Sequence, residues 1–251
     1  MIDFHSHILP EVDDGAPDME TALAMLRKCT EIGIDTIVLT PHCYYIQDED
    51  ISDFINLRNQ KYSELKEAMK MDGGNFPKVL LGAELHLSKF HARSQLLNGL
   101  AIEGTNYILI EMPAGKWEPD LYDLLYSLSL KGLRPIMAHI DRYLYGHRKD
   151  FHNLFSLDLA YQVNADAFLL RGIKKKTPYF FEHGAIHILG SDMHNLAERN
   201  NRMNEAKQVL LTKYGKDYYD FIEENSQLII NNEEFNIECF EKMPFKKRIK
   251  L

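Results

Sequence analysis

The stretch "MIDFHSHILPEVDDG", residues 1–15, begins with a short apolar run that leads directly into two histidines. The run predicts a β-strand over Ile2–Phe4. Side chains two residues apart on a strand point to the same face, so His5 and His7 can bind one metal ion. An N-terminal segment that supplies two ligands has to be ordered. We therefore expect this segment to be the first strand of the fold.

Six further runs of apolar and β-branched residues recur along the chain. They are continuous rather than alternating, which is typical of parallel strands that are covered on both faces. We expect these strands over Asp35–Thr40, Lys78–Glu84, Tyr107–Met112, Arg134–His139, Ala160–Ala165 and Ile186–Ser191.

Amphipathic segments with helical spacing lie between the expected strands. Asp18 and Ser52 are candidate N-caps of two helices, Pro119 stands in the first turn of a third, and a fourth ends at Gly215. Strands that alternate with helices form right-handed βαβ units. Seven such strands in 251 residues favour a closed barrel over an open sheet. Because we find no linker or repeat, we expect one α/β domain over residues 1–251.

The charge and the cysteine content narrow the functional classes. A formal net charge of −8 argues against a nucleic-acid-binding surface, which needs a basic stripe. The charge is compatible with a phosphorylated substrate, because bound metal ions can reverse it locally. The three cysteines form no CxxC pair, and no apolar run reaches membrane-spanning length. We therefore expect a cytoplasmic protein with no signal peptide and no membrane insertion.

Residue types that bind metals follow six of the seven expected strands. The carboxyl ends of the strands in a parallel barrel meet at one face, so these residues are expected to converge. Each of them alone has an ordinary explanation as a surface or capping residue, but their shared position favours a metal site. Imidazole and carboxylate together suit Mn²⁺, Zn²⁺ or iron, and paired ions can activate a water and clamp a phosphoryl group. The candidates are His5, His7, His42, Glu84, Glu111, His139, Asp192 and His194.

The motifs "DFHSHILPEVDDG", "TPH", "GAE", "LIEM", "AHIDRY" and "SDMHN" resemble those of the PHP (polymerase and histidinol phosphatase) superfamily. More narrowly, the chain is similar to bacterial PHP-type protein tyrosine phosphatases of capsular and exopolysaccharide loci, from residue 1 to about residue 215. The resemblance implies a distorted (β/α)7 TIM-like barrel, the PHP fold. It also implies three divalent metal ions, most often manganese, with iron, zinc or magnesium as alternatives.

The resemblance assigns roles to individual residues. It implies a first metal position at His5, His7, Glu84 and Asp192, a second at Glu84, Glu111 and His139, and a third at Asp14, His42 and His194. Arg142 and Arg199 would bind the substrate phosphate. The alternative role for Arg142 is a salt bridge to a neighbouring carboxylate. The family usually continues the Arg199 segment with two prolines, where this chain has Asn200 and Asn201. His42, His194 or a metal-bound water would donate a proton to the leaving group if one is needed.

The function predicted on this basis is hydrolysis of phosphotyrosine by a hydroxide that bridges two metal ions. The substrate would be a bacterial tyrosine kinase or another protein of polysaccharide synthesis. Two alternatives stay open: a PHP phosphatase of a small phosphomonoester, such as histidinol phosphate or a nucleotide, and a non-catalytic regulatory PHP module. The regulatory module should lack some ligands, and none is missing here.

Three further expectations concern residues around this centre. No cysteine is followed by an arginine six positions later, so we expect no cysteine phosphoenzyme, and the absence of a P-loop argues against a nucleotide cofactor. Tyr44, Tyr45 and Trp117 either flank a phosphotyrosine ring or pack within their loops. For the remaining histidines, His86 among them, we expect structural roles.

Overall fold

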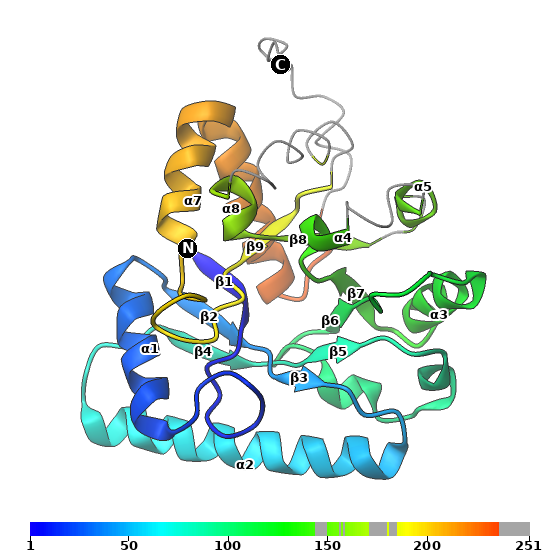
Figure 1. Ribbon diagram of the computed structural model, residues 1–251, viewed down its shortest axis with the longest axis horizontal. Helices are drawn as coiled ribbons and strands as arrows, with labels where there is room; N and C mark the ends of the chain where they lie inside the picture. Colours follow the sequence, from blue (N-terminus) through cyan, green and yellow to red (C-terminus); the bar gives the residue numbers. More distant parts are fainter. Residues whose placement is uncertain (144–149, 156, 158, 171–179, 181–184, 236–251) are drawn as a thin grey trace.

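The computed structural model describes residues 1–143, 150–155, 157, 159–170, 180 and 185–235, so Cys239 lies outside the described residues. Its strands pair in parallel throughout (Figure 1). They are β1 (Ile2–Ser6), β2 (Thr36–Leu39), β3 (His42–Cys43), β4 (Lys78–Leu81), β5 (Glu84–His86), β6 (Tyr107–Glu111), β7 (Arg134–Met137), β8 (Ala160–Asn164) and β9 (Ile188–Gly190).

The expected strand over Asp35–Thr40 is observed as β2, and a further short strand, β3, follows it; the expected strand over Lys78–Glu84 is divided into β4 and β5. Pro41 lies between β2 and β3, and Gly82 lies between β4 and β5. Proline cannot donate a backbone hydrogen bond to a ladder. The carbonyl of Gly82 instead accepts a hydrogen bond from Arg58 Nη1 at 3.0 Å. Two of the short strands begin with a candidate ligand: β3 begins with His42, and β5 begins with Glu84.

The strands form a ring. One sheet has the order β1-β2-β4, and the other has the order β3-β5-β6-β7-β8-β9. The last strand, β9, meets the first, because His7 N donates to Met193 O at 2.8 Å and Asp192 N donates to His5 O at 2.8 Å. This closure confirms the expected α/β barrel with seven strand positions.

Helices surround the ring (Figure 1). They are α1 (Met19–Glu31), α2 (Asp48–Asp72), α3 (Pro119–Leu130), α4 (Ile140–Tyr143), α5 (Phe151–Leu154), α7 (Met203–Val209) and α8 (Lys216–Ile230). Short 3-10 turns cover Lys89–Arg93, Leu97–Leu100 and Ala165–Phe168, and α7 continues as a π-turn over Leu210–Tyr214. None of the helices in the described part of the chain is long and apolar enough to cross a lipid bilayer.

The helix ends agree with the sequence in three cases, one of which is the end at Gly215, and differ in one. Asp18 caps α1, since its Oδ1 accepts from Thr21 N at 2.8 Å, and Pro119 is the first residue of α3. The expected cap at Ser52 is wrong, because α2 begins four residues earlier, at Asp48. The first turn of α2 contains three acidic residues, which favour a helix start by interacting with the positive end of the helix dipole.

Two apolar clusters lie on opposite faces of the strands. The inner cluster fills the ring with side chains such as Phe4, Leu109 and Ile136, and Ile229 of α8 packs against them. The outer cluster joins the strands to the surrounding helices and contains Met137 among others. Burial of both faces explains why the strands are continuous apolar runs.

β1 contains one extra residue relative to β2. Ile2 and Asp3 pair with Thr36 and Ile37, whereas Ser6 pairs with Leu39. Such a bulge lets two consecutive residues point to the same side. Phe4 therefore packs in the inner cluster, while the next residue, His5, also faces the interior at the carboxyl end of the ring.

Candidate metal centre at the carboxyl ends of the strands

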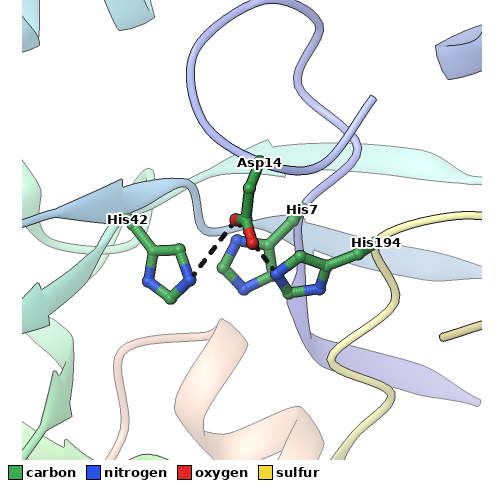
Figure 2. Close-up of side chains that lie close together, drawn as sticks. All are labelled: His7, Asp14, His42 and His194. Atoms are coloured by element: carbon green, nitrogen blue, oxygen red, sulfur yellow. Dashed lines mark ion pairs between the residues drawn. The ribbon is translucent and has the colours of Figure 1, made fainter. Parts of the chain in front are cut away.

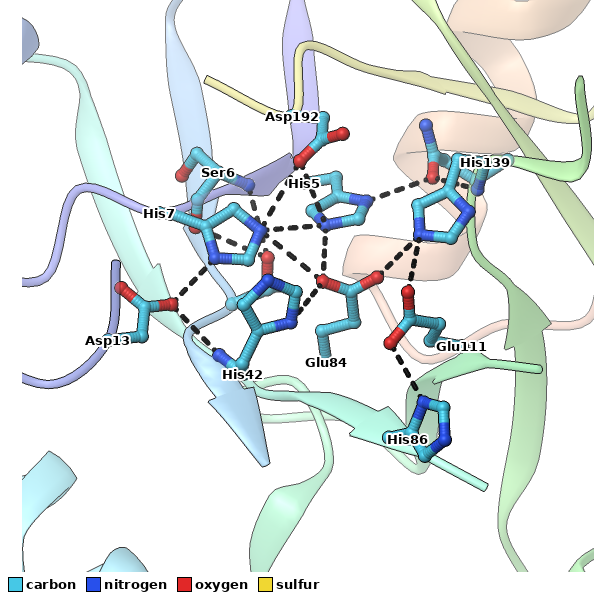
Figure 3. Close-up of polar contacts among 12 residues, drawn as sticks. His5, Ser6, His7, Asp13, His42, Glu84, His86, Glu111, His139 and Asp192 are labelled. Carbon is cyan, nitrogen blue, oxygen red and sulfur yellow. Dashed lines mark hydrogen bonds and ion pairs between the residues drawn. The ribbon is translucent and has the colours of Figure 1, made fainter. Parts of the chain in front are cut away.

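His5 of β1 and His7, which directly follows that strand, converge as expected. Their side chains are fully buried, and the two Nε2 atoms are 3.0 Å apart. The Glu84 Oε2 atom lies 3.0 Å from His5 Nε2 and 3.3 Å from His7 Nε2, and Asp192 Oδ1 lies 3.8 and 3.4 Å from the same atoms. Two imidazole nitrogens and two carboxylates therefore face a single point (Figure 3).

Glu84 lies at the middle of the cluster. Its Oε2 also approaches His42 Nδ1 at 3.0 Å, and its Oε1 lies 2.7 Å from His139 Nε2. His139 Nε2 is 3.6 Å from Glu111 Oε1, so a second carboxylate adjoins the first. Burial raises the pKa of Glu84, but the surrounding histidines outweigh it and hold that pKa well below the ordinary 4.5. Glu84 is therefore a buried carboxylate that stays charged.

A second group of ligand types adjoins the first. It consists of His7, Asp14, His42 and His194, which point toward one another (Figure 2). His7 and Asp14 lie in the connection between β1 and α1, His42 lies in β3, and His194 follows β9. Asp14 Oδ1 is 3.3 Å from His194 Nε2 and 3.7 Å from His42 Nε2. Each residue offers one ligand atom, and these atoms lie within 4.8 Å of one another, which is close enough for one metal ion.

The charge and the lone pairs of this centre suit cations. Asp14, Glu84, Glu111 and Asp192 supply four formal negative charges around the imidazole rings. The Nε2 atom of His194 is buried and makes no hydrogen bond with the described residues. Burial, together with His7 and Arg199, lowers the pKa of His194 to about 2. A neutral ring nitrogen with an unused lone pair can coordinate a metal ion.

Asp13, which sequence analysis did not single out, orients two of the histidines. Its Oδ2 accepts from His7 Nδ1 at 2.6 Å and from the backbone N of His42 at 2.9 Å. Burial raises the pKa of Asp13, but the bond to His7 outweighs this and lowers the pKa to about 2. A carboxylate on the far nitrogen fixes the ring and leaves Nε2 directed at the centre.

Asp13→Asn is expected to weaken Mn²⁺ binding by about 10–100-fold, because the amide would hold the His7 ring less firmly than the carboxylate does. Isothermal titration with Mn²⁺ measures the change. Asp53→Asn, at an exposed position of α2, is the matched control. Equal affinities of Asp13→Asn and the wild type would show that Asp13 does not orient the ring.

Strand β8, which has no obvious ligand in the sequence, contributes a polar chain instead. Gln162 Oε1 accepts from His5 Nδ1 at 3.1 Å and from His139 N at 2.7 Å. Gln162 Nε2 donates to Asn164 Oδ1 at 2.8 Å, and Asn164 Nδ2 donates to Asp192 Oδ2 at 3.1 Å. These bonds hold three candidate ligands in place.

Two candidate ligands occupy a left-handed backbone conformation. Among the described residues, four that are not glycine have a positive φ, and they include His139 at 30° and Asp192 at 55°. Such residues are strained and are concentrated at functional sites. The hydrogen bonds from His139 N to Gln162 and from Asp192 N to His5 O hold this conformation.

Both expected arginines reach the centre. Arg142 Nη2 contacts Asp192 Oδ2, and Arg199 Nη2 donates to Asp192 Oδ1 at 3.1 Å. Arg199 Nη1 is also 3.7 Å from Asp14 Oδ2. The two side chains are 41% and 40% exposed, so each guanidinium lies at the mouth of the ring. Arg142 therefore forms the salt bridge that was the alternative to phosphate binding, and its partner, Asp192, is itself a candidate metal ligand.

The aromatic residues near the mouth differ in their positions. Tyr44 is exposed and stacks on His42 with ring centroids 4.9 Å apart. Trp117 is buried and donates from Nε1 to Pro113 O at 2.8 Å, so it packs within its loop. Tyr45 packs on Phe54 of α2, with centroids 5.8 Å apart. Among the ring contacts of the described residues, Tyr44 is therefore the one of these three aromatic residues that stacks on a candidate metal ligand.

His86 also takes part in the centre, although the sequence suggests only a structural role. Its Nδ1 lies 3.0 Å from Glu111 Oε2, on the side away from His139 (Figure 3). His86 and Tyr44 line a cavity of ≈ 380 Å³ that also borders Lys89 and Leu121. The cavity therefore adjoins the candidate metal centre, because Tyr44 contacts His42 and His86 contacts Glu111.

Known proteins resemble this chain along nearly its whole length. The family model described as "Capsular polysaccharide synthesis, CpsB/CapC" matches residues 1–231, a range that includes every candidate ligand. The chain is 31% identical over 248 residues to the tyrosine-protein phosphatase YwqE of Bacillus subtilis, which covers 93% of this chain and 92% of YwqE. It is 28% identical over 247 residues to the tyrosine-protein phosphatase CpsB of Streptococcus agalactiae, which covers 92% and 99%.

Solved structures share the fold of this chain. A chain from the crystal structures of YwqE from Bacillus subtilis and CpsB from Streptococcus pneumoniae, described as unique metal-dependent tyrosine phosphatases, matches with a TM-score of 0.79 and 27% identity. The match covers 94% of this chain and 96% of the other. An inactive dihydroorotase-like domain of a Chaetomium thermophilum protein matches with a TM-score of 0.54 at 12% identity, which shows a shared fold alone.

Proposed function

Because the chain belongs to the capsular polysaccharide synthesis family CpsB/CapC, we propose that it is a metal-dependent protein tyrosine phosphatase. The observation that carries the proposal is the buried, charged Glu84 carboxylate, which faces ring nitrogens of four histidines from three strand positions. This donor set suits divalent transition metals. The named relatives are tyrosine-protein phosphatases, which supports phosphotyrosine as the substrate class.

We assign three divalent ions to the centre, with Mn²⁺ as the best match to its mixed imidazole and carboxylate ligands. His5, His7, Glu84 and Asp192 would hold one, Glu84, Glu111 and His139 a second, and Asp14, His42 and His194 a third. When bound, such ions activate a water for attack on phosphorus and neutralise the phosphoryl oxygens.

Arg142 and Arg199 are assigned to the substrate phosphate. Their forked guanidinium groups can each donate two hydrogen bonds to phosphate oxygens. Both side chains are anchored on Asp192 and remain about two-fifths exposed, so they can turn toward a phosphate that enters from solvent. His194 is assigned to ligation rather than acid catalysis, because its pKa is about 2. His42 remains the candidate proton donor among the two histidines.

The described cysteines support a mechanism without a cysteine phosphoenzyme. Cys29 and Cys43 are both buried. Burial raises the pKa of Cys43 to about 11, and the pKa of Cys29 is raised further. Neither thiol is a thiolate near neutral pH, so neither is an activated nucleophile.

We propose that the substrate is a phosphotyrosyl protein of capsule or exopolysaccharide synthesis, such as a bacterial tyrosine kinase, in the cytoplasm. Tyr44 supports an aromatic substrate because its exposed ring lies beside His42 at the mouth. The cavity beside Tyr44 and His86 offers space for residues that flank a phosphotyrosine.

Phosphate release from a phosphotyrosyl peptide tests the proposal, beside histidinol phosphate and a nucleoside monophosphate. We expect release from the peptide that requires Mn²⁺, stops with chelator and falls by at least about 10²-fold in His139→Asn, because a ligand is lost. Preference for either small substrate would overturn the tyrosine phosphatase assignment. Bound metal without turnover of any of the three would favour the regulatory alternative.

A further inference from the structure

We propose that Asp3 and Asn201 form a buried clamp that positions Arg199 for phosphate, an inference that rests on the proposed phosphatase function. Asp3 lies in β1, Asn201 lies in the segment between β9 and α7, and both are at most 6% exposed. Neither residue belongs to the candidate metal centre. Their side chains meet directly, since Asn201 Nδ2 donates to Asp3 Oδ2 at 2.7 Å.

The other oxygen of Asp3 joins two strands that carry candidate ligands. Asp3 Oδ1 accepts from Ser191 N at 2.8 Å and from His5 N at 3.2 Å. Ser191 immediately precedes Asp192, the carboxylate that both arginines contact. One buried carboxylate thus holds the backbone of His5, the backbone next to Asp192 and the side chain of Asn201.

The segment that carries Arg199 is tied down at both of its ends. At its start, Arg199 O accepts from His194 N at 2.9 Å, and Asn195 Oδ1 accepts from Arg199 N at 3.1 Å. At its end, Asn201 Oδ1 accepts from Met203 N, the first residue of α7, at 3.0 Å. Asn201 therefore connects β1 and α7 at a point two residues beyond Arg199.

This anchoring has a consequence for the exposed arginine. A long side chain that is two-fifths exposed loses conformational freedom when it binds a phosphate. If its backbone is already fixed, only the side chain remains to be ordered, and the guanidinium starts from a position beside Asp192. Asp3 and Asn201 are positioning residues in this sense, because they act on phosphate through Arg199 and do not touch it.

Binding of inorganic phosphate to the Mn²⁺-loaded protein tests the clamp, together with kinetics and bound-metal analysis. Asn201→Ala is expected to raise the dissociation constant for phosphate and the KM by about tenfold or more, with bound metal unchanged. Asn200→Ala, at the neighbouring half-buried asparagine, is the control and should match the wild type. In an Arg199→Ala background, Asn201→Ala should have no further effect on phosphate binding. An undiminished effect in that background would overturn the inference.

The double variant Asp3→Asn/Asn201→Asp keeps the test decisive if Asn201→Ala unfolds. The exchange preserves the bond between the two side chains and the acceptors of the backbone bonds, since an amide at position 3 can donate to a carboxylate at position 201 and still accept two backbone bonds. Only the long contact of Asn201 Nδ2 with Cys29 Sγ, at 3.6 Å, loses its donor. Phosphate binding near the wild-type level supports the clamp, and its loss in a folded, metal-loaded protein contradicts it. Absence of turnover and phosphate binding in the wild type would instead contradict the proposed function.

Discussion

Glu84→Gln is expected to lower kcat/KM for a phosphotyrosyl peptide by at least about 10³-fold. Glutamine preserves the size of the side chain and one acceptor oxygen, so the packing around it changes little. The substitution removes the negative charge that ring nitrogens of His5, His42 and His139 approach within 3.0 Å. Without that charge, the clustered imidazoles lose the group that best compensates a bound cation.

Metal analysis separates this effect from a loss of folding. Glu84→Gln should bind less Mn²⁺ than the wild type while retaining its circular dichroism spectrum. Glu31→Gln, at a side chain of α1 that is 65% exposed, removes the same charge from the surface and should leave activity unchanged. Full metal content and full activity in Glu84→Gln would contradict the central role of this carboxylate.

Gly15→Ala is expected to lower kcat/KM by about 10²-fold and the free energy of unfolding by about 1–3 kcal/mol. A Cβ atom on Gly15 would lie 1.9 Å from the backbone O of His7, far inside contact distance. The same oxygen accepts from Ala16 N at 3.0 Å, so the turn has to open to admit the methyl group. Opening moves Asp13 and Asp14, which precede the glycine.

The matched control for this substitution is Gly115→Ala. No atom lies within 4 Å of a Cβ at Gly115, so this methyl group meets open space. Urea unfolding and steady-state kinetics measure both effects on the two variants. Gly15→Ala with unchanged activity would show that the acidic turn can shift without consequence, which would weaken the assignment of Asp14.

The sequence reveals which residues gather, because strand ends meet at one face of a parallel barrel. His42, Glu111 and His194 lie far apart along the chain, yet the apolar runs before them predict that all three lie at one face of the ring. That inference needs only the strand positions and the rule of parallel closure. The fold and the convergence of these side chains were therefore predictable, whereas the parts played by His86 and Asp13 were not.

The orientation of the individual side chains was harder to predict from the sequence. Gln162 sits within an apolar run, where a single polar residue has no periodic signal, and only the register of β8 shows that it supports His5. Asp13 and Asp14 are adjacent in sequence, and the conformation of the turn at Gly15 decides which one faces His7 Nδ1. The extra residue in β1 is likewise a property of strand pairing rather than of composition.

The left-handed backbone at His139 and Asp192 also restricts which sequences can fill these positions. Asparagine, aspartate, histidine and glycine visit that conformation readily, whereas alanine and above all β-branched residues resist it. An alanine substitution at either position would change the backbone conformation as well as remove the side chain, so its effect on activity would combine the two causes. Asparagine is the cleaner probe at both sites, and natural drift at these two positions should be confined to the same small set of residue types.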